Sequence, residues 1–292
     1  MESSLSRTLL ERAAASNGLE VKQSSLIRNG SHVMWKIPGG IVGRVGERGT
    51  DDVARKEVEV SRWLRASGVR ATRAIDDVTQ PTVVEGYPVT WWELLPESRP
   101  AAPAELGAAL RRLHDLPEPR GLSLPRFSPF EAARERLKNA EMPNSDDTTW
   151  VLNRMAEVDR RCNEILPNLP TGVIHGDAWQ GNFAIIDSQD PVMLDLEAFC
   201  VGPKLWDLIA IAVDCTDFAR IPESEYEGFT AAYQFDVTTS PAYRTLAEVQ
   251  ELRWTSYVIG KSKPGSAEES EAAHRVACLK GEVERPWKWA PF

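Results

Sequence analysis

The sequence predicts an α+β protein of two lobes, with a small N-terminal antiparallel β-sheet lobe plus one helix and a larger, mainly α-helical C-terminal lobe. Three observations support this: strand-like runs separated by glycine turns before residue 95, a proline-rich segment after it, and helical periodicity beyond. With 292 residues, 42% of them hydrophobic, the chain is long enough to give each lobe a core. We therefore expect lobes at 1–95 and 96–292.

The N-terminal lobe is predicted from leucines at helical spacing, Asn-Gly and Pro-Gly-Gly turn signals, and a glycine helix stop. A tight connection at Gly86 separates the last two strands, and Trp91 and Trp92 add large apolar side chains to them. The expected elements are a helix at 3–15, strands at 25–27, 32–37 and 41–45, a helix at 51–68, and two strands within 82–95.

The predicted C-terminal lobe opens with the stretch PESRPAAPAE at 96–105, whose prolines and polar residues predict a hinge between the lobes. Beyond the hinge, apolar residues recur every three or four positions, which predicts helices. These helices are expected at 106–116, 150–165, 205–213, 223–234 and 246–259, with a surface loop at 262–270.

Composition excludes several classes of protein. With 34 basic and 43 acidic residues, the net charge of −9 argues against nucleic acid as a partner, although an acidic surface would suit a cationic small molecule. The four cysteines form no C-x-x-C pair and the four histidines form no zinc-type pairing. No run has the length of a signal or membrane segment, so we expect a cytoplasmic protein with no membrane partner.

The most informative stretch is VIHGDAWQGNFAIIDSQDPVMLDLEAF at 173–199, which predicts a loop, a strand, a turn and a second strand. Asp177 and Asn182 have the D-x-x-x-x-N spacing of the protein-kinase catalytic loop, and Asp195 stands at the end of the hairpin. In phosphoryl transfer, one carboxylate faces the acceptor hydroxyl while other oxygen ligands hold Mg²⁺. The spacing therefore indicates kinase chemistry.

These motifs give the sequence a resemblance to the aminoglycoside phosphotransferase family of kinase-like enzymes. The resemblance covers nearly the whole chain and implies a bilobal protein-kinase-like fold. It also implies transfer of the γ-phosphate of ATP or GTP, with Mg²⁺, to a hydroxyl of an aminoglycoside-like antibiotic, amino sugar or related metabolite. The matching residues are His175-Gly176-Asp177, Asn182, Asp195-Leu196-Glu197, Gly202, Pro203, Asp207 and Leu208.

The resemblance also assigns roles within the motifs. It implies that Asp177 is the catalytic base and that Asn182 and Asp195 are metal ligands. His175 and Asp207 are expected to support the catalytic loop. Glu197, two residues after Asp195, is expected to support the metal site.

For the nucleotide, the family comparison points to Arg44, where such kinases commonly have lysine, and to Glu57 as its pairing glutamate. Arg44 as a surface cation paired with Glu57 is the alternative, and Lys36 is another candidate for the phosphate contact. Ser31 lies in an Asn-Gly-Ser turn over the phosphates in this interpretation, although Asn-Gly also predicts a simple hairpin turn. Glu93 belongs to the expected hinge that meets the adenine edge.

Substrate residues are expected in the helical lobe. Trp179, inside the catalytic loop, could stack on a sugar or a cation, although core packing explains it equally. Asp214 and Asp217 could form an acidic rim, and a solvated helix face is the alternative. The expected partner is a small-molecule acceptor, cationic or sugar-like.

Other functions fit the same motifs. Choline, sugar and amino-acid kinases share the fold, which leaves the acceptor and any role in antibiotic resistance open. A catalytically silent nucleotide-binding protein would lack the base or the metal ligands, and this chain retains all three. A protein kinase is disfavoured because the segment between Asp195 and Asp207 is too short for an activation loop, and no A-P-E follows.

Overall fold

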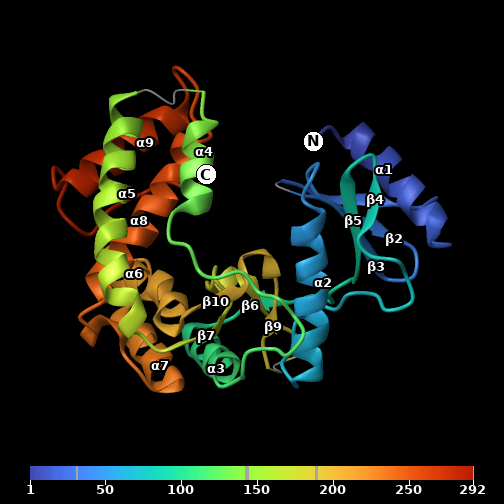
Figure 1. Cartoon of the computed structure of the whole chain (residues 1–292), viewed down its shortest axis with the longest axis horizontal. Helices are drawn as coiled ribbons and strands as arrows, with labels where there is room; N and C mark the ends of the chain where they lie inside the picture. Colours follow the sequence, from blue (N-terminus) through green and yellow to red (C-terminus); the bar gives the residue numbers. More distant parts are fainter. Residues whose placement is uncertain (31, 142–144, 188–189, 292) are drawn as a thin grey trace. The chain divides into compact units, whose positions relative to one another are not determined.

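The computed structural model describes residues 1–30, 32–141, 145–187 and 190–291. The chain forms two compact units (Figure 1). The first unit contains Met1–Pro125 and Gln180–Phe199, and the second contains Arg126–Trp179 and Cys200–Phe292. The predicted lobe 1–95 thus lies within the first unit together with later segments, and the functional boundary after residue 95 stays a prediction.

The first unit is built on a five-stranded antiparallel sheet with the strand order β1-β2-β3-β5-β4. Helix α1 packs on one face and helix α2 lies against the other (Figure 1). The elements are α1 (Ser3–Ser16), β1 (Ser25–Asn29), β2 (Val33–Ile37), β3 (Ile41–Val45), α2 (Asp51–Ala66), β4 (Thr82–Val84) and β5 (Tyr87–Glu93).

The two faces of this sheet have separate apolar cores because successive strand residues point to opposite sides. Leu10 of α1 packs with Trp91 on one face, while Val42 and Trp92 pack on the other. A Cβ atom at Gly43 would lie 2.3 Å from Leu10 Cδ1 and 2.9 Å from Trp91, so β3 requires glycine there. Helix α1 therefore lies directly against the strand.

A second, three-stranded sheet completes the first unit, with the order β6-β8-β9. Its strands are β6 (Arg99–Pro100), β8 (Phe183–Ile185) and β9 (Val192–Met193), and α3 (Pro103–His114) follows β6. The proline-rich segment predicted as a hinge thus contributes one short strand and the start of a helix. Thr72 N donates to Met193 O at 2.7 Å, which links the segment after α2 to the hairpin.

The second unit is mainly helical. Helix α8 packs against α4, α5, α6 and α9. A two-stranded sheet of β7 and β10 precedes the two segments that contain Asp177 and Asp207. The elements are α4 (Glu131–Lys138), α5 (Asp146–Ile165), β7 (Thr171–Ile174), β10 (Cys200–Pro203), α6 (Ile209–Thr216), α7 (Glu223–Tyr233), α8 (Tyr243–Ile259) and α9 (Ala267–Lys280).

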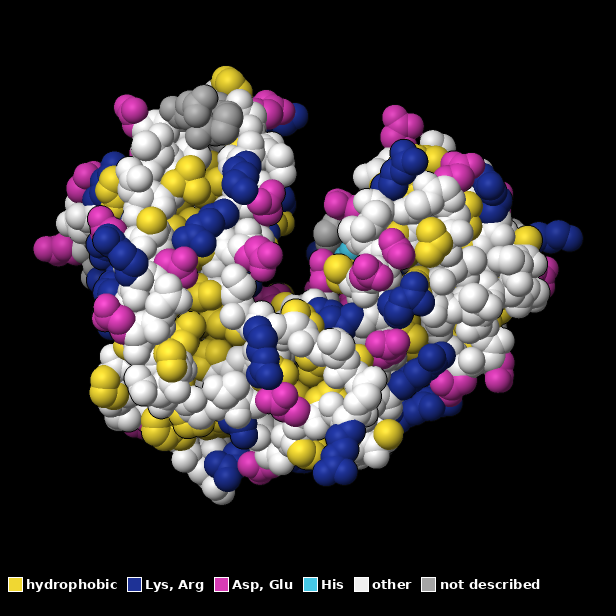
Figure 2. All heavy atoms as spheres, viewed as in Figure 1, with side chains coloured by type: hydrophobic (Ala, Val, Ile, Leu, Met, Phe, Trp, Pro, Cys, Tyr) yellow, Lys and Arg dark blue, Asp and Glu magenta, His cyan; other side chains and the backbone are white. Residues whose placement is uncertain are grey.

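The predicted α+β fold, with an antiparallel sheet lobe and a mainly helical C-terminal part, is confirmed. Figure 2 shows lysine and arginine side chains lying among aspartate and glutamate side chains on the drawn face of each unit. Among the described helices, none is both long and apolar enough to cross a membrane.

An ion-pair cluster with two buried carboxylates lies in the second unit. Asp217 pairs with Arg244 at 2.8 Å and with Arg285 at 2.6 Å, and Arg244 also donates to Glu251 at 2.5 Å. The Glu251 side chain is only 2% exposed. Burial raises the pKa of Glu251 from 4.5 to about 7, although Arg244 acts in the opposite direction.

Glu251 should make the stability of the protein depend on pH. A carboxyl whose pKa is raised on folding contributes stability below its unfolded pKa, and that contribution is lost as pH rises through the folded value. We expect the free energy of unfolding to fall between pH 5 and 7 by up to about 1.4 kcal/mol per pH unit from this group. Urea unfolding of the wild type and of Glu251→Gln at several pH values measures this dependence of the free energy of unfolding on pH. Parallel pH profiles for the two proteins would contradict the assignment.

Candidate active site

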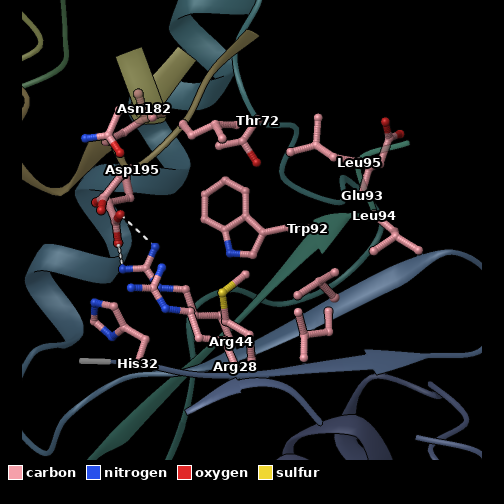
Figure 3. A pocket seen from close by; sticks show the side chains of 17 residues that line it. Arg28, His32, Arg44, Thr72, Trp92, Glu93, Leu94, Leu95, Asn182 and Asp195 are labelled. Carbon is pink, nitrogen blue, oxygen red and sulfur yellow. Dashed lines mark hydrogen bonds and ion pairs between the residues drawn. The ribbon is translucent and has the colours of Figure 1, made fainter. Parts of the chain in front are cut away.

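A cavity of about 350 Å³ lies in the first unit, beside the sheet face that carries Arg44 (Figure 3). Strands β1, β2, β3 and β5 provide one part of its wall, and residues 181–182 and 194–196 provide another. The cavity brings together five of the predicted site residues: Arg44, Glu57, Glu93, Asn182 and Asp195.

One part of the cavity is apolar. Met34, Val42 and Trp92 line it, and the indole of Trp92 is held by a hydrogen bond from Nε1 to Thr90 Oγ1 at 2.8 Å. Leu94 and Leu95 continue this wall after β5 (Figure 3). A slot of this composition suits a flat ring such as a purine.

The end of β5 leaves a backbone donor at the cavity. The N–H groups of Glu93 and Leu94 donate to Arg73 O at 2.8 Å and to Gly40 O at 2.7 Å. The N–H of Leu95 forms no hydrogen bond with any described residue. The Glu93 side chain is half exposed and pairs with Arg73 at 2.9 Å.

Arg44 and Glu57 form a two-point ion pair. The two terminal nitrogens of the guanidinium donate to the two carboxylate oxygens, each at 2.9 Å. The Glu57 side chain is 2% exposed and that of Arg44 14%, so this is an interior pair rather than a surface one. Burial raises the pKa of Glu57, and the charge of Arg44 opposes that effect. Lys36, the other candidate, is exposed.

Removing Arg44 should leave a buried carboxylate without its partner. We expect Arg44→Met to lower the free energy of unfolding by about 3 kcal/mol. The double variant Arg44→Met/Glu57→Gln should recover part of that loss because it removes the unpaired charge. Urea denaturation measures these values. Arg7→Met, which breaks the exposed pair with Glu11, is the matched control and should cost less than about 1 kcal/mol. A loss at Arg44 as small as the control's would contradict an interior pair.

Glu197 is tied to two side chains that no sequence motif marked. His32 Nε2 lies 3.1 Å from Glu197 Oε2, and Lys56 donates to the Glu197 carbonyl and to Phe199 O, the latter at 3.2 Å. The hydrogen bond with His32 lowers the pKa of Glu197, against the effect of burial. Lys56 of α2 thus holds the turn that follows Asp195, and the supporting role expected for Glu197 stays a prediction.

Asn182 and Asp195 are positioned by the hairpin of β8 and β9. Leu194 N donates to Asn182 O at 2.8 Å, which holds the residue before Asp195 beside Asn182. Asp195 has a φ of 51°, a conformation that is strained for a residue other than glycine and is often found at functional sites. Both side chains face the cavity (Figure 3).

These two side chains fit a divalent cation. Amide and carboxylate oxygens are hard ligands, and Mg²⁺ usually takes one or two of them together with waters and nucleotide phosphates. Among the described residues, no group of three or more His, Cys, Asp or Glu side chains could hold a metal ion. Phosphate and water oxygens would therefore have to complete the coordination.

Ser31, which was predicted to lie over the nucleotide phosphates, lies outside the described residues.

The catalytic loop lies in the second unit, after β7. Asp207 accepts hydrogen bonds from His175 N at 2.7 Å and Gly176 N at 2.9 Å, and Trp206 Nε1 donates to Gly176 O at 2.9 Å. His175 and Asp207 are buried. These contacts fix the backbone immediately before Asp177. Asp207 does so through both of its carboxylate oxygens, as expected for a loop support.

The predicted substrate residues have different surroundings. Trp179 is 53% exposed and so has a free ring surface. Asp214 pairs with Arg220 at 2.8 Å. Asp217 is buried within the ion-pair cluster with Arg244 and Arg285, because two guanidinium groups neutralise it there. Its carboxylate is not part of an exposed rim, and its predicted contact with substrate gains no support from this position.

The comparison with solved structures identifies the fold as that of small-molecule kinases. Amicoumacin kinase in complex with AMP-PNP, Ca²⁺ and Ami is 14% identical, with 97% of each chain covered and a TM-score of 0.76. A choline/ethanolamine kinase family protein from Mesorhizobium loti is 20% identical, with 98% of this chain and 96% of that chain covered and a TM-score of 0.64. At these identities the likeness concerns the fold.

A third solved structure has the same fold. Aminoglycoside phosphotransferase APH(3'')-Id from Streptomyces rimosus, in complex with ADP and streptomycin, is 20% identical, with a TM-score of 0.64. The match covers 87% of this chain and 100% of that chain. No curated protein matches the sequence. The model of the phosphotransferase enzyme family (APH) matches residues 34–249, so the chain belongs to that family. The resemblance inferred from the motifs is confirmed.

Proposed function

We propose that this protein transfers the γ-phosphate of Mg-ATP or Mg-GTP to a hydroxyl of a small molecule. One observation carries the proposal: a single cavity joins an apolar slot to the Arg44–Glu57 pair and to the two oxygen-bearing residues Asn182 and Asp195. Solved relatives of the same fold hold AMP-PNP with Ca²⁺, or ADP, which supports a nucleotide and a divalent cation.

In this proposal each part of the cavity contacts one part of the nucleotide. The purine lies between Met34 and Trp92 and accepts a hydrogen bond from Leu95 N–H, while Arg44 contacts the phosphates. Asn182 and Asp195 hold Mg²⁺, which would neutralise charge on the phosphate oxygens. Glu57 keeps the Arg44 guanidinium in place.

Asp177 acts on the acceptor. Its carboxylate accepts the proton of the acceptor hydroxyl as the hydroxyl oxygen bonds to the γ-phosphorus. The bond from that phosphorus to the β,γ-bridging oxygen breaks, and the nucleoside diphosphate leaves. Asp207 orients the loop through His175 N and Gly176 N. A cytoplasmic location, where ATP and GTP are available, belongs to the proposal.

The acceptor class distinguishes the remaining alternatives. Proteins with this fold include a choline kinase, a spectinomycin phosphotransferase and an aminoglycoside phosphotransferase solved with streptomycin, so antibiotics, choline-like amines, sugars and amino acids are all candidates. The experiment incubates the protein with Mg-ATP or Mg-GTP and one acceptor at a time, and detects the phosphorylated product by mass spectrometry. Nucleotide binding without any phosphorylated product would favour a catalytically silent protein.

A further inference from the structure

Two arginines of the second unit lie near the catalytic loop. The guanidinium carbon of Arg253, on α8, lies 4.9 Å from the centre of the Trp206 ring. The same indole donates to Gly176 O, in the residue before Asp177. Arg253 is therefore one side chain away from the backbone that positions the proposed base.

Arg136, on α4, follows the same face of α8. One of its terminal nitrogens lies 3.4 Å from Ser256 Oγ, and its guanidinium carbon lies 5.4 Å from the centre of the Tyr257 ring. A Cβ atom at Gly260 would lie 2.5 Å from Cγ of Arg136, so the stem of this arginine crosses the helix at a glycine. Residues 253, 256, 257 and 260 recur at helical spacing and share one face of α8.

The charges of these two arginines are not balanced within the described residues. Neither guanidinium has a carboxylate within ion-pair distance there, whereas the more buried Arg275 pairs with Glu271 at 2.7 Å. Both arginines are half-buried, and burial lowers the pKa of each. The negative charge of Asp177 acts in the opposite direction on Arg253, and the charge of Arg136 adds to the lowering.

Two half-buried cations that repel each other cost free energy unless an anion offsets them. The Arg253 guanidinium stacks on Trp206 through its face, so the stacking does not use its N–H edge. That edge is the part of a guanidinium that binds carboxylate or phosphate oxygens at two points. The two arginines thus have the chemistry of an anion-binding site. They lie near the loop of the proposed base Asp177, which acts on the acceptor molecule.

We propose that Arg253 and Arg136 bind an anionic group of the acceptor, so that the acceptor is a hydroxyl compound bearing a carboxylate or a phosphate. This inference rests on the proposed phosphotransferase function and replaces the cationic acceptor that net charge suggested with an anionic one. The phosphates of the nucleotide are the other source of the same chemistry, and kinetics distinguish the two sources.

The test uses three classes of acceptor with matched skeletons: anionic galacturonate and glycerate, neutral galactose and glycerol, and cationic galactosamine and serinol. Mass spectrometry detects phosphate transfer from Mg-ATP or Mg-GTP. We expect transfer to an anionic member at a kcat/KM at least about 10-fold above its matched partners. Preference for neutral or cationic members would overturn the inference and leave the proposed function intact. Transfer to no member of any class would count against the proposed function itself.

Arginine variants then show whether the bound anionic group belongs to the acceptor or to the nucleotide. Arg253→Gln should raise the KM for the anionic acceptor about 10- to 100-fold while the KM for the nucleotide changes little. Arg253→Lys should recover part of the loss, and Arg160→Gln, at an exposed arginine of α5, is the matched control. An increase confined to the nucleotide KM would show that the arginines bind the nucleotide phosphates and would overturn the proposal. Equal losses for all acceptor classes would indicate a purely structural role and would also overturn it.

Discussion

Replacement of Asp195 by alanine is expected to reduce phosphate transfer by about 10³-fold, because the variant removes the carboxylate that the proposal assigns to the metal ion together with Asn182. Without it, the divalent cation and the nucleotide phosphates lose both a ligand and a compensating charge. Measurement of kcat/KM across a Mg²⁺ titration should show a loss that added Mg²⁺ only partly reverses. Asp190→Ala, at an exposed aspartate near the same hairpin, is the control.

The backbone at Asp195 complicates the alanine variant, since a φ of 51° disfavours alanine. Asn is tolerated in this conformation, so Asp195→Asn separates loss of charge from loss of backbone geometry. We expect Asp195→Asn to keep the thermal stability of the wild type and to lose most of its activity. A fully active Asp195→Asn variant would remove Asp195 from the metal site.

The second large effect is expected at Asp177. Asp177→Asn keeps the size of the side chain and the hydrogen bonds of Asp207 to the loop backbone, but it cannot accept the hydroxyl proton. We expect kcat to fall about 10²- to 10⁴-fold with little change in the nucleotide KM. Steady-state kinetics with a phosphorylated acceptor as product measure both values.

Asp146→Asn, at an exposed aspartate of α5, controls for loss of negative charge in the second unit. If Asp177→Asn raised the nucleotide KM and left kcat unchanged, Asp177 would be a binding residue and the proton would have another acceptor. Full activity in both the Asp177 and the Asp195 variants would reject the proposed chemistry.

Much of the first unit could be predicted from sequence because its strands are short and bounded by glycine turns. The turn signals did not indicate which face of β3 borders the cavity: Val42 and Arg44 share that face, and Trp92 lies opposite Val42 on β5. The pairing of Arg44 with Glu57 depended on the family resemblance, since the two residues are 13 positions apart and on different elements.

Other parts of the site depend on tertiary contacts that leave no local pattern. His32 contacts Glu197 across 165 positions. Arg73 O and Gly40 O accept from the N–H groups of Glu93 and Leu94, and within the described part of the chain the N–H of Leu95 has no acceptor. Asp217 looked like part of an acidic cluster because its guanidinium partners come from later segments. Helix α9 was assigned in part to a loop, although Ser266, which accepts from Glu269 N at 3.2 Å, is a recognisable helix start.

The adjacent residues Gly43 and Arg44 belong to opposite faces of β3, and the two faces differ in the side chains that they can accommodate. One face has no room for a Cβ atom under Leu10 and Trp91, and the other carries the Arg44 cation that lines the cavity. A slip of one residue during strand pairing would push a guanidinium into the apolar core and leave the pocket without its charge. Correct alignment of this strand during folding therefore decides two things at once, because a misaligned chain would lack both a stable core and the cation that lines the cavity.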